Sequence, residues 1–234
     1  MLKFVVAGST GQIGTEISDY LAERKLSYFL LPGIRFRTPA EILNQLPSGK
    51  KILINCIGST PNSTSGSQIN YRRDNIDTLD FLEEVLKLNG NFVHLIHLSS
   101  WLADFTKSDD SYAESKYISE SKVRDISRNL GISSLILRIP TLWKGYPQQP
   151  TRLLSAILNK EQILNGDKIV NIITPELFKE SLQDLIDEKC TGGTVEVVGW
   201  KGEINSLIKG LECDLENSAT IEALKKIVFS YTKY

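Results

Sequence analysis

The chain has 234 residues, which at roughly 100–200 residues per domain predicts one α/β domain with a modest appendage. Hydrophobic residues make up 41% and charged residues 24% of it, a composition typical of soluble globular proteins, which argues against a coiled coil, a collagen-like fibre or a disordered regulator. Because the formal net charge is −1, no global field favours nucleic acid or an anionic membrane as a partner.

The cysteines and the apolar segments bear on the cellular compartment. Cys56, Cys190 and Cys213 lie far apart and form no C-x-x-C pair, so we expect neither a disulfide framework nor a metal site. The first apolar run is too short for a signal peptide, and no stretch approaches the roughly 18 apolar residues of a membrane span. We therefore expect a cytoplasmic protein that does not enter a membrane.

Strand-length apolar runs alternate with helical patterns in the first part of the chain. In chain order, the patterns predict a strand at 2–7, a helix at 12–24, a strand at 27–31, a helix at 38–46, a strand at 51–57, a helix at 69–88, a strand at 92–98, a helix at 111–131 and a strand at 132–139. Thr38 with Glu41, and Ser111 with Glu114, have the spacing of capping boxes. This alternation predicts a doubly wound parallel sheet with right-handed crossovers.

The alternation is looser after Gly145. We expect a helix at 151–159, a strand at 168–173, a helix at 174–188, a strand at 194–198 and two terminal helices. The predicted organisation is a dinucleotide-binding domain at 1–140 and a small α/β substrate-binding region at 141–234, integrated with the first rather than independent.

Gly8, Gly11 and Gly14 follow the first strand and open the first helix with G-x-x-G-x-x-G spacing. Glycine lets the chain turn sharply, lets the backbone approach a pyrophosphate and lets the helix pack on the strand, while the helix N-terminus supplies N–H groups. In this context the motif predicts a Rossmann-type dinucleotide site; the alternative is a structural turn without a ligand.

The end of the second strand bears on the choice of cofactor. NAD sites usually place an acidic residue there, but residues 30–37 contain none. Arg35 or Arg37 could bind a 2′-phosphate, which favours NADP(H) and leaves NAD(H) open. The alternative is that both arginines merely solvate a loop.

Tyr112 and Lys116 are four residues apart and thus share one helix face. We expect the ammonium group to stabilise a phenolate and to lower the tyrosine pKa towards the range of a general acid/base. The helix follows a strand ending in Ser99 and Ser100, and the carboxyl ends of parallel strands bind ligands in open α/β sheets. A serine hydroxyl there can hydrogen-bond a substrate carbonyl or alcohol.

These motifs together resemble the extended short-chain dehydrogenases/reductases, the NAD-dependent epimerase/dehydratase family, which act on nucleotide sugars. The matching segments follow the family's order: the glycine motif, 54–58, 71–83 with Asn75 at the family's asparagine, the serine strand end, the Tyr112/Lys116 pair and 137–140. The short route between the second and third strands is most similar to dTDP-4-dehydrorhamnose reductases.

The resemblance implies roles for individual residues. Tyr112 would be the general acid/base, Lys116 would bind the nicotinamide ribose, and Ser100, with Ser99 as second choice, would orient the reacting oxygen. Together with Arg35 and Arg37, the cofactor contacts would be Gly8, Thr10, Gly11, Gln12, Ile13, Gly14, Cys56, Ile57, Gly58, Asn75, Lys116, Ile139, Pro140 and Thr141. Substrate contacts would come from Ser100, Tyr112, Trp143, Tyr146 and Arg152, although the last three also fit an ordinary surface loop.

The family's dehydratases carry an acidic pair where this chain has Trp101 and Leu102, so a 4,6-dehydratase is not expected. His94 and His97 differ by three positions on a strand and therefore do not form an acid/base pair. The resulting hypothesis is an NAD(P)(H)-dependent oxidoreductase that reduces a keto group of a nucleotide-activated sugar. A nucleotide-sugar 4-epimerase and a non-catalytic dinucleotide-binding protein are the alternatives. The resemblance also implies a homodimer formed through the helices at 69–88 and 111–129.

Overall fold

The computed structural model describes residues 2–31, 33, 37–61, 69–104, 110–142, 169–187, 192–203 and 205–206. The chain divides into two compact units, one made of Met1–Ile139 and Leu185–Glu196, the other of Pro140–Asp184 and Val197–Tyr234. The helix expected at 151–159, the two terminal helices and the candidate residues Arg35, Trp143, Tyr146 and Arg152 lie outside the described residues.

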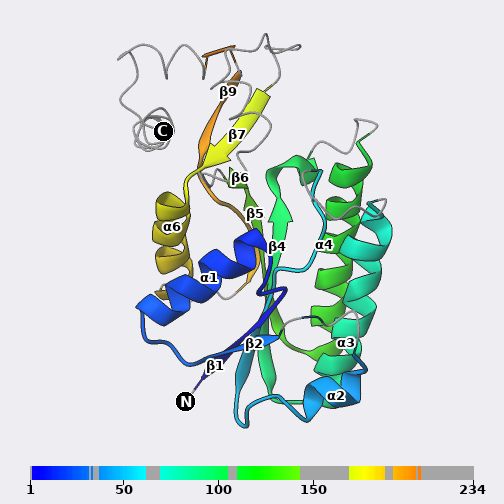
Figure 1. Ribbon diagram of the computed structural model, residues 1–234. Coiled ribbons are helices and arrows are strands. Elements are labelled where there is room, and N and C mark those ends of the chain that lie inside the picture. The colour runs from blue at the N-terminus through cyan, green and yellow to red at the C-terminus, as the bar shows by residue number, and fades with distance from the viewer. Residues whose placement is uncertain are drawn as a thin grey trace. The chain divides into compact units, whose positions relative to one another are not determined.

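A six-stranded parallel sheet forms the centre of the first unit (Figure 1). Its strands are β1 (Lys3–Ala7), β2 (Tyr28–Leu31), β3 (Lys51–Asn55), β4 (Phe92–Ser100), β5 (Ser133–Ile139) and β8 (Gly193–Glu196), in the order β2-β1-β3-β4-β5-β8. The chain runs outward from β1 to β2 and then crosses to β3, on the other side of β1. The doubly wound Rossmann-like α/β fold predicted from the sequence is confirmed, with its switch point between β1 and β3, where such sheets bind ligands.

Helices cover both faces of this sheet (Figure 1). Helix α1 (Gln12–Glu23) lies on one face, and α3 (Thr78–Leu88) and α4 (Ser111–Leu130) lie on the other, with the short α2 (Pro39–Leu43) beside α3. Apolar residues at helical spacing face the sheet, among them Leu79, Leu82, Val85 and Leu86 of α3 and Val123 and Ile126 of α4. They pack on strand residues such as Val5, Leu53, Leu95 and Ile136 to form the core.

Helix starts agree with the sequence in one case and differ in another. Thr38 forms the expected capping box: its hydroxyl accepts from the Glu41 backbone N–H, and the Glu41 carboxylate accepts from the Thr38 N–H. Ser111 is not the N-cap of α4, because the Asp110 carboxylate, one residue earlier, accepts from the backbone N–H groups of Tyr112 and Ala113.

The helix expected over 69–88 has two parts. It begins with a π-helical turn, η2 (Arg72–Asp77), and continues as the regular helix α3. Such turns are rare and occur often at functional sites.

The strand expected at 194–198 is β8. It pairs in parallel with β5 and is the outermost strand of the main sheet.

The second unit contains a three-stranded sheet in the order β6-β7-β9. Strand β7 (Ile169–Ile173) pairs in parallel with β6 (Thr141–Leu142) and antiparallel with β9 (Trp200–Glu203). Helix α6 (Pro175–Asp187) starts at the proline expected to open it. None of the helices within the described ranges combines the length and apolarity that crossing a bilayer requires.

Candidate active site

The glycine turn after β1 is built by close backbone contacts. Gly8 has φ +78°, and a Cβ there would lie 2.9 Å from the backbone of Cys56 and Ile57, which follow β3. A Cβ on Gly14 would lie 2.2 Å from the Gly8 carbonyl oxygen. Gly11 is the N-cap residue of α1, and because it has no side chain it accepts no hydrogen bond from the first N–H groups of the helix through one. The first and last glycines of the motif are therefore required for the turn itself to form.

The tip of the turn is open to solvent. Thr10, Gly11 and Gln12 are exposed, Ile13 is half-buried, and Gly14 is buried against the turn. The turn lies at the carboxyl end of β1, at the switch point of the sheet, with the amino terminus of α1 directly behind it. A cradle of this kind, which a Cβ would fill, suits the pyrophosphate of a dinucleotide.

A second close approach occurs after β3. A Cβ on Gly58 would lie 2.5 Å from Asn75 Oδ1 and 3.1 Å from Lys116 Nζ. The loop after β3, the π-helical turn η2 and helix α4 thus meet at Gly58. Cys56, Ile57 and Gly58 were expected to contact the cofactor, and the structure brings them next to Gly8 and Lys116.

Asn75 connects these three segments. Its Oδ1 accepts from the Ser59 backbone N–H at 2.9 Å, and its Nδ2 donates to Ser59 O at 3.3 Å and to Ser115 Oγ at 2.9 Å. The preceding residue in the turn, Asp74, accepts from Ser59 Oγ at 2.5 Å. Both Nδ2 protons are used within the protein, so in this structure Asn75 holds the loop against α4.

Tyr112 lies at the start of α4 and is 7% exposed. Its ring centroid is 5.5 Å from that of Tyr71, and Lys116 Nζ lies 5.9 Å from the Tyr112 centroid. Burial raises the pKa of Tyr112 to about 12, a hydrogen bond with Ser100 lowers it, and Tyr71 and Asp110 raise it. The expected lowering of this pKa by Lys116 is not found in this structure, because desolvation dominates.

Lys116 is buried one turn after Tyr112, on the same face of α4. Its Nζ donates to the Leu98 carbonyl oxygen of β4 at 3.3 Å. Burial lowers the pKa of Lys116 to about 8, whereas Cys56 and Glu120 act to raise it. The ammonium is therefore charged at neutral pH but close to its titration range.

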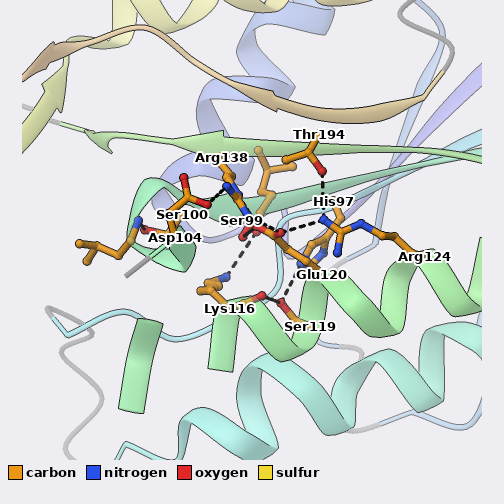
Figure 2. A network of polar contacts seen from close by, with 12 residues as sticks. His97, Ser99, Ser100, Asp104, Lys116, Ser119, Glu120, Arg124, Arg138 and Thr194 are labelled. Atoms are coloured by element: carbon orange, nitrogen blue, oxygen red, sulfur yellow. Dashed lines mark hydrogen bonds and ion pairs between the residues drawn. The ribbon is translucent and has the colours of Figure 1, made fainter. Parts of the chain in front are cut away.

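The structure separates the two candidate serines. Ser100, the last residue of β4, hydrogen-bonds Tyr112 and accepts from the Leu102 backbone N–H at 3.3 Å. Ser99 donates instead to Glu120 Oε1 at 2.7 Å, within the buried polar network drawn in Figure 2. Of the two serines, Ser100 is therefore the one that lies beside the phenol of Tyr112.

The histidines have structural partners. His97 lies between Asn55 Nδ2 at 3.0 Å and Ser119 Oγ at 3.2 Å, and burial together with the Lys116 charge lowers its pKa to about 3. His94 contacts Ser133 Oγ at 2.5 Å. As expected, the two rings do not form a pair.

The remaining cofactor candidates lie at two places. Ile139 ends β5 and stands opposite Ser100 in the register of the sheet, and Pro140 and Thr141 follow it in the chain. Arg37 Nη1 donates to Gln45 Oε1 at 2.6 Å, so its guanidinium is bound to a side chain that follows α2. Sequence reasoning did not identify Glu120, although its position four residues after Lys116 on a predicted helix was a signal.

The fold and this site together define a Rossmann-type α/β protein with a glycine cradle at the switch point and a buried Tyr/Lys pair at the carboxyl end of β4. No family model and no curated protein sequence matches the chain. Solved structures do match it, at low sequence identity.

UDP-glucuronic acid 4-epimerase from Bacillus cereus, in complex with NAD, is 17% identical with a TM-score of 0.71, over 93% of this chain and 84% of that one. RMD from Pseudomonas aeruginosa, complexed with NADPH, is 18% identical with a TM-score of 0.69, over 90% of this chain and 81% of that one. UDP-N-acetylglucosamine 4-epimerase from Methanobrevibacter ruminantium M1 is 20% identical with a TM-score of 0.65, over 93% of this chain and 83% of that one. These similarities establish the shared fold over most of both chains.

Proposed function

We propose that this protein is an NAD(P)(H)-dependent enzyme that transfers a hydride to or from a nucleotide-activated sugar. The observation that carries the proposal is the placement of Tyr112, Lys116 and Ser100 at the carboxyl end of β4, beside the loop that meets the glycine turn. The proposal is also supported by the similar structures, which include UDP-sugar 4-epimerases and proteins solved with NAD or NADPH.

The chain's own residues would perform three tasks. The Gly8–Gly14 turn would bind the pyrophosphate through the start of α1, and Lys116 would bind the nicotinamide ribose. Ser100 would hold the reacting carbonyl or alcohol oxygen next to Tyr112. When the carbonyl carbon receives a hydride, the phenol would donate its proton to the developing alkoxide and regain one from solvent. A bound nicotinamide would supply that hydride from C4.

Two reactions fit this arrangement. In a reductase, one reduced dinucleotide is consumed for every keto sugar that is converted. In a 4-epimerase, the dinucleotide is regenerated in each turnover, because the same hydride is removed from and returned to the sugar. We favour the reductase on the sequence pattern, while the 4-epimerases among the similar structures support the alternative.

The test is a stoichiometry measurement with purified protein. A panel of nucleotide sugars and their 4-keto derivatives is incubated with NADPH or NADH, and both the cofactor absorbance and the sugar product are followed. Reductase action gives one oxidised cofactor per product, and epimerase action gives product without net oxidation. Dinucleotide binding with neither reaction would support a non-catalytic binding protein and contradict the proposal.

The homodimer expected from the resemblance stays a prediction. Tyr117 and Ile118 on α4 are large apolar residues that are 51% and 40% exposed, which is consistent with contacts to another chain. Sedimentation equilibrium of the purified protein tests the oligomeric state.

A further inference from the structure

Glu120 lies on α4 two turns after Tyr112 and one turn after Lys116, and its side chain is fully buried. Its carboxylate is satisfied on both oxygens. Oε1 accepts from Ser99 Oγ at 2.7 Å and from Arg138 Nε at 2.8 Å, while Oε2 accepts from Arg138 Nη2 at 2.9 Å and from Arg124 Nη2 at 3.1 Å. Figure 2 shows Glu120 at the centre of this network.

The network connects α4 to several parts of the sheet. Ser99 of β4 and Arg138 of β5 are register partners, so the carboxylate binds two neighbouring strands at once. Arg138 also pairs with Asp104, just after β4, and Arg124 donates to Thr194 Oγ1 of β8 at 3.1 Å. The strand end that carries Ser100 is therefore tied to the helix that carries Tyr112.

Lys116 is the other charged group on this buried face of α4. The titratable groups that face it are the Cys56 thiol after β3, His97 of β4, and Tyr112 and Glu120 of its own helix. Burial raises the pKa of Cys56 to about 12, and the pKa of His97 is about 3, so both are neutral where Lys116 titrates. The phenol of Tyr112, whose pKa burial raises to about 12, is also neutral in the pH range where Lys116 titrates.

Of the two groups that act to raise the pKa of Lys116, Cys56 and Glu120, Glu120 is the one that is ionised where Lys116 titrates. Burial acts to raise the pKa of Glu120, but hydrogen bonds from Arg138 and Ser99 and the charges of Arg138 and Arg124 together lower it. The carboxylate therefore stays ionised at neutral pH. A buried ammonium group is costly without an opposite charge nearby. Glu120, which also pairs with Arg138 and Arg124, lies four residues after Lys116 on the same buried face of α4.

We propose that Glu120 is a positioning residue of the candidate site: it balances the Lys116 ammonium and, through Ser99, fixes the strand end that places Ser100 beside Tyr112. This proposal rests on the function proposed above for Tyr112, Lys116 and Ser100. It also gives Ser99 a role, as the hydroxyl that links the strand to the helix rather than as a group that touches substrate.

The charge-balancing role is tested by titrating Lys116 directly. The protein is labelled with isotopic lysine, the Lys116 resonance is assigned by its loss in Lys116→Met, and its pH titration is followed by NMR. Glu120→Gln is expected to lower the midpoint from about 8 by about one pH unit or more. Glu120→Asp keeps the charge and should keep the midpoint near that of the wild type.

Asp104→Asn is the matched control, because it removes a carboxylate from the same network but not one that faces Lys116. Its midpoint should equal that of the wild type. An unchanged midpoint in Glu120→Gln, or an equal shift in Asp104→Asn, overturns the charge-balancing role. If Glu120→Gln fails to fold because Arg138 loses its partner, Glu120→Gln/Arg138→Gln is compared with Arg138→Gln, so that loss of the carboxylate is the one difference, and the same lowering of the midpoint is expected.

The strand-fixing role is tested by kinetics. Ser99→Ala removes the link from β4 to Glu120 without changing any charge, so kcat should fall about tenfold while KM for the dinucleotide stays constant, and Ser99→Thr should restore kcat. A wild-type kcat in Ser99→Ala overturns this role. A wild-type protein that converts no nucleotide sugar contradicts the proposed function, but the Lys116 titration needs no substrate and still decides the role of Glu120.

Discussion

A Cβ on Gly14 would lie 2.2 Å from the carbonyl oxygen of Gly8, so the first helix begins in direct contact with the turn that precedes it. Gly14→Ala is therefore expected to destabilise the protein by about 1–3 kcal/mol, because backbone on both sides must shift, and to weaken dinucleotide binding. Urea unfolding and dinucleotide titration measure the two effects.

Gly11→Ala is the matched control for this prediction. A Cβ there would be 3.4 Å from the same carbonyl oxygen, an ordinary contact, so the loss of stability should stay below about 1 kcal/mol. Equal losses in the two variants would show that close packing is not the reason for glycine at position 14.

Tyr112→Phe removes the phenolic oxygen but keeps the ring that packs against Tyr71. Turnover is expected to fall about 10²–10⁴-fold, since the proton donor is lost, while the dissociation constant of the dinucleotide stays nearly the same. Tyr117→Phe, on the exposed side of the same helix, is the control and should behave like the wild type. Retained turnover in Tyr112→Phe would exclude this tyrosine as the acid/base.

Ser100→Ala removes the hydrogen bond that lowers the pKa of Tyr112. The pKa of the phenol should therefore rise above its present value of about 12, and any step that needs the phenolate should shift to higher pH. The pH profile of kcat and a spectroscopic titration of the phenol measure the shift. A profile identical to that of the wild type would mean that Ser100 does not act on Tyr112.

Lys116→Met should stabilise the fold while it abolishes turnover. Burial lowers the pKa of Lys116 to about 8, whereas the unfolded chain keeps the usual value of 10.5. The unfolded state thus binds more protons between these values, and wild-type stability rises as pH increases through that window. The variant lacks this cost and should be about 1–3 kcal/mol more stable at pH 7, with a difference that shrinks above pH 8.

Lys87→Met provides the control for the stability measurement. Lys87 is exposed and pairs with Glu83 at 2.7 Å, so its replacement should change the free energy of unfolding by less than about 0.5 kcal/mol at any of these pH values. Urea unfolding at pH 7 and near pH 10 compares the three proteins. A Lys116→Met variant less stable than the wild type at pH 7 contradicts the prediction.

Arg37→Ala tests the preference for NADP(H) that we infer from the absence of an acid at the end of β2. If the Arg37 guanidinium leaves Gln45 to bind a 2′-phosphate, the variant should lose tenfold or more of its affinity for NADPH and little for NADH. The ratio of the two dissociation constants is the readout. Equal losses for both cofactors would assign Arg37 a structural role only.

Local signals explain why much of the fold could be predicted. The glycine turn, the helix carrying Tyr112 and Lys116 and the alternation of strands and helices each depend on residues close together in the chain. Runs of apolar residues of strand length predict buried parallel strands without knowledge of their neighbours. The positions of β1, α1, β3, α4 and β5 therefore agree with expectation to within a few residues at either end.

Contacts between distant segments decided the rest. The sequence left Ser99 and Ser100 as alternatives. The packing of α4 against β4 is what brings Ser99 into a hydrogen bond with Glu120 and Ser100 into one with Tyr112. It likewise predicted a lowered Tyr112 pKa from the nearby lysine, whereas burial, which depends on the whole fold, raises it. The sequence by itself determined which side chains share a helix face or follow a strand. The tertiary structure determined which of them are buried and which face one another. Desolvation and the charges of neighbouring groups then set the pKa values of these side chains.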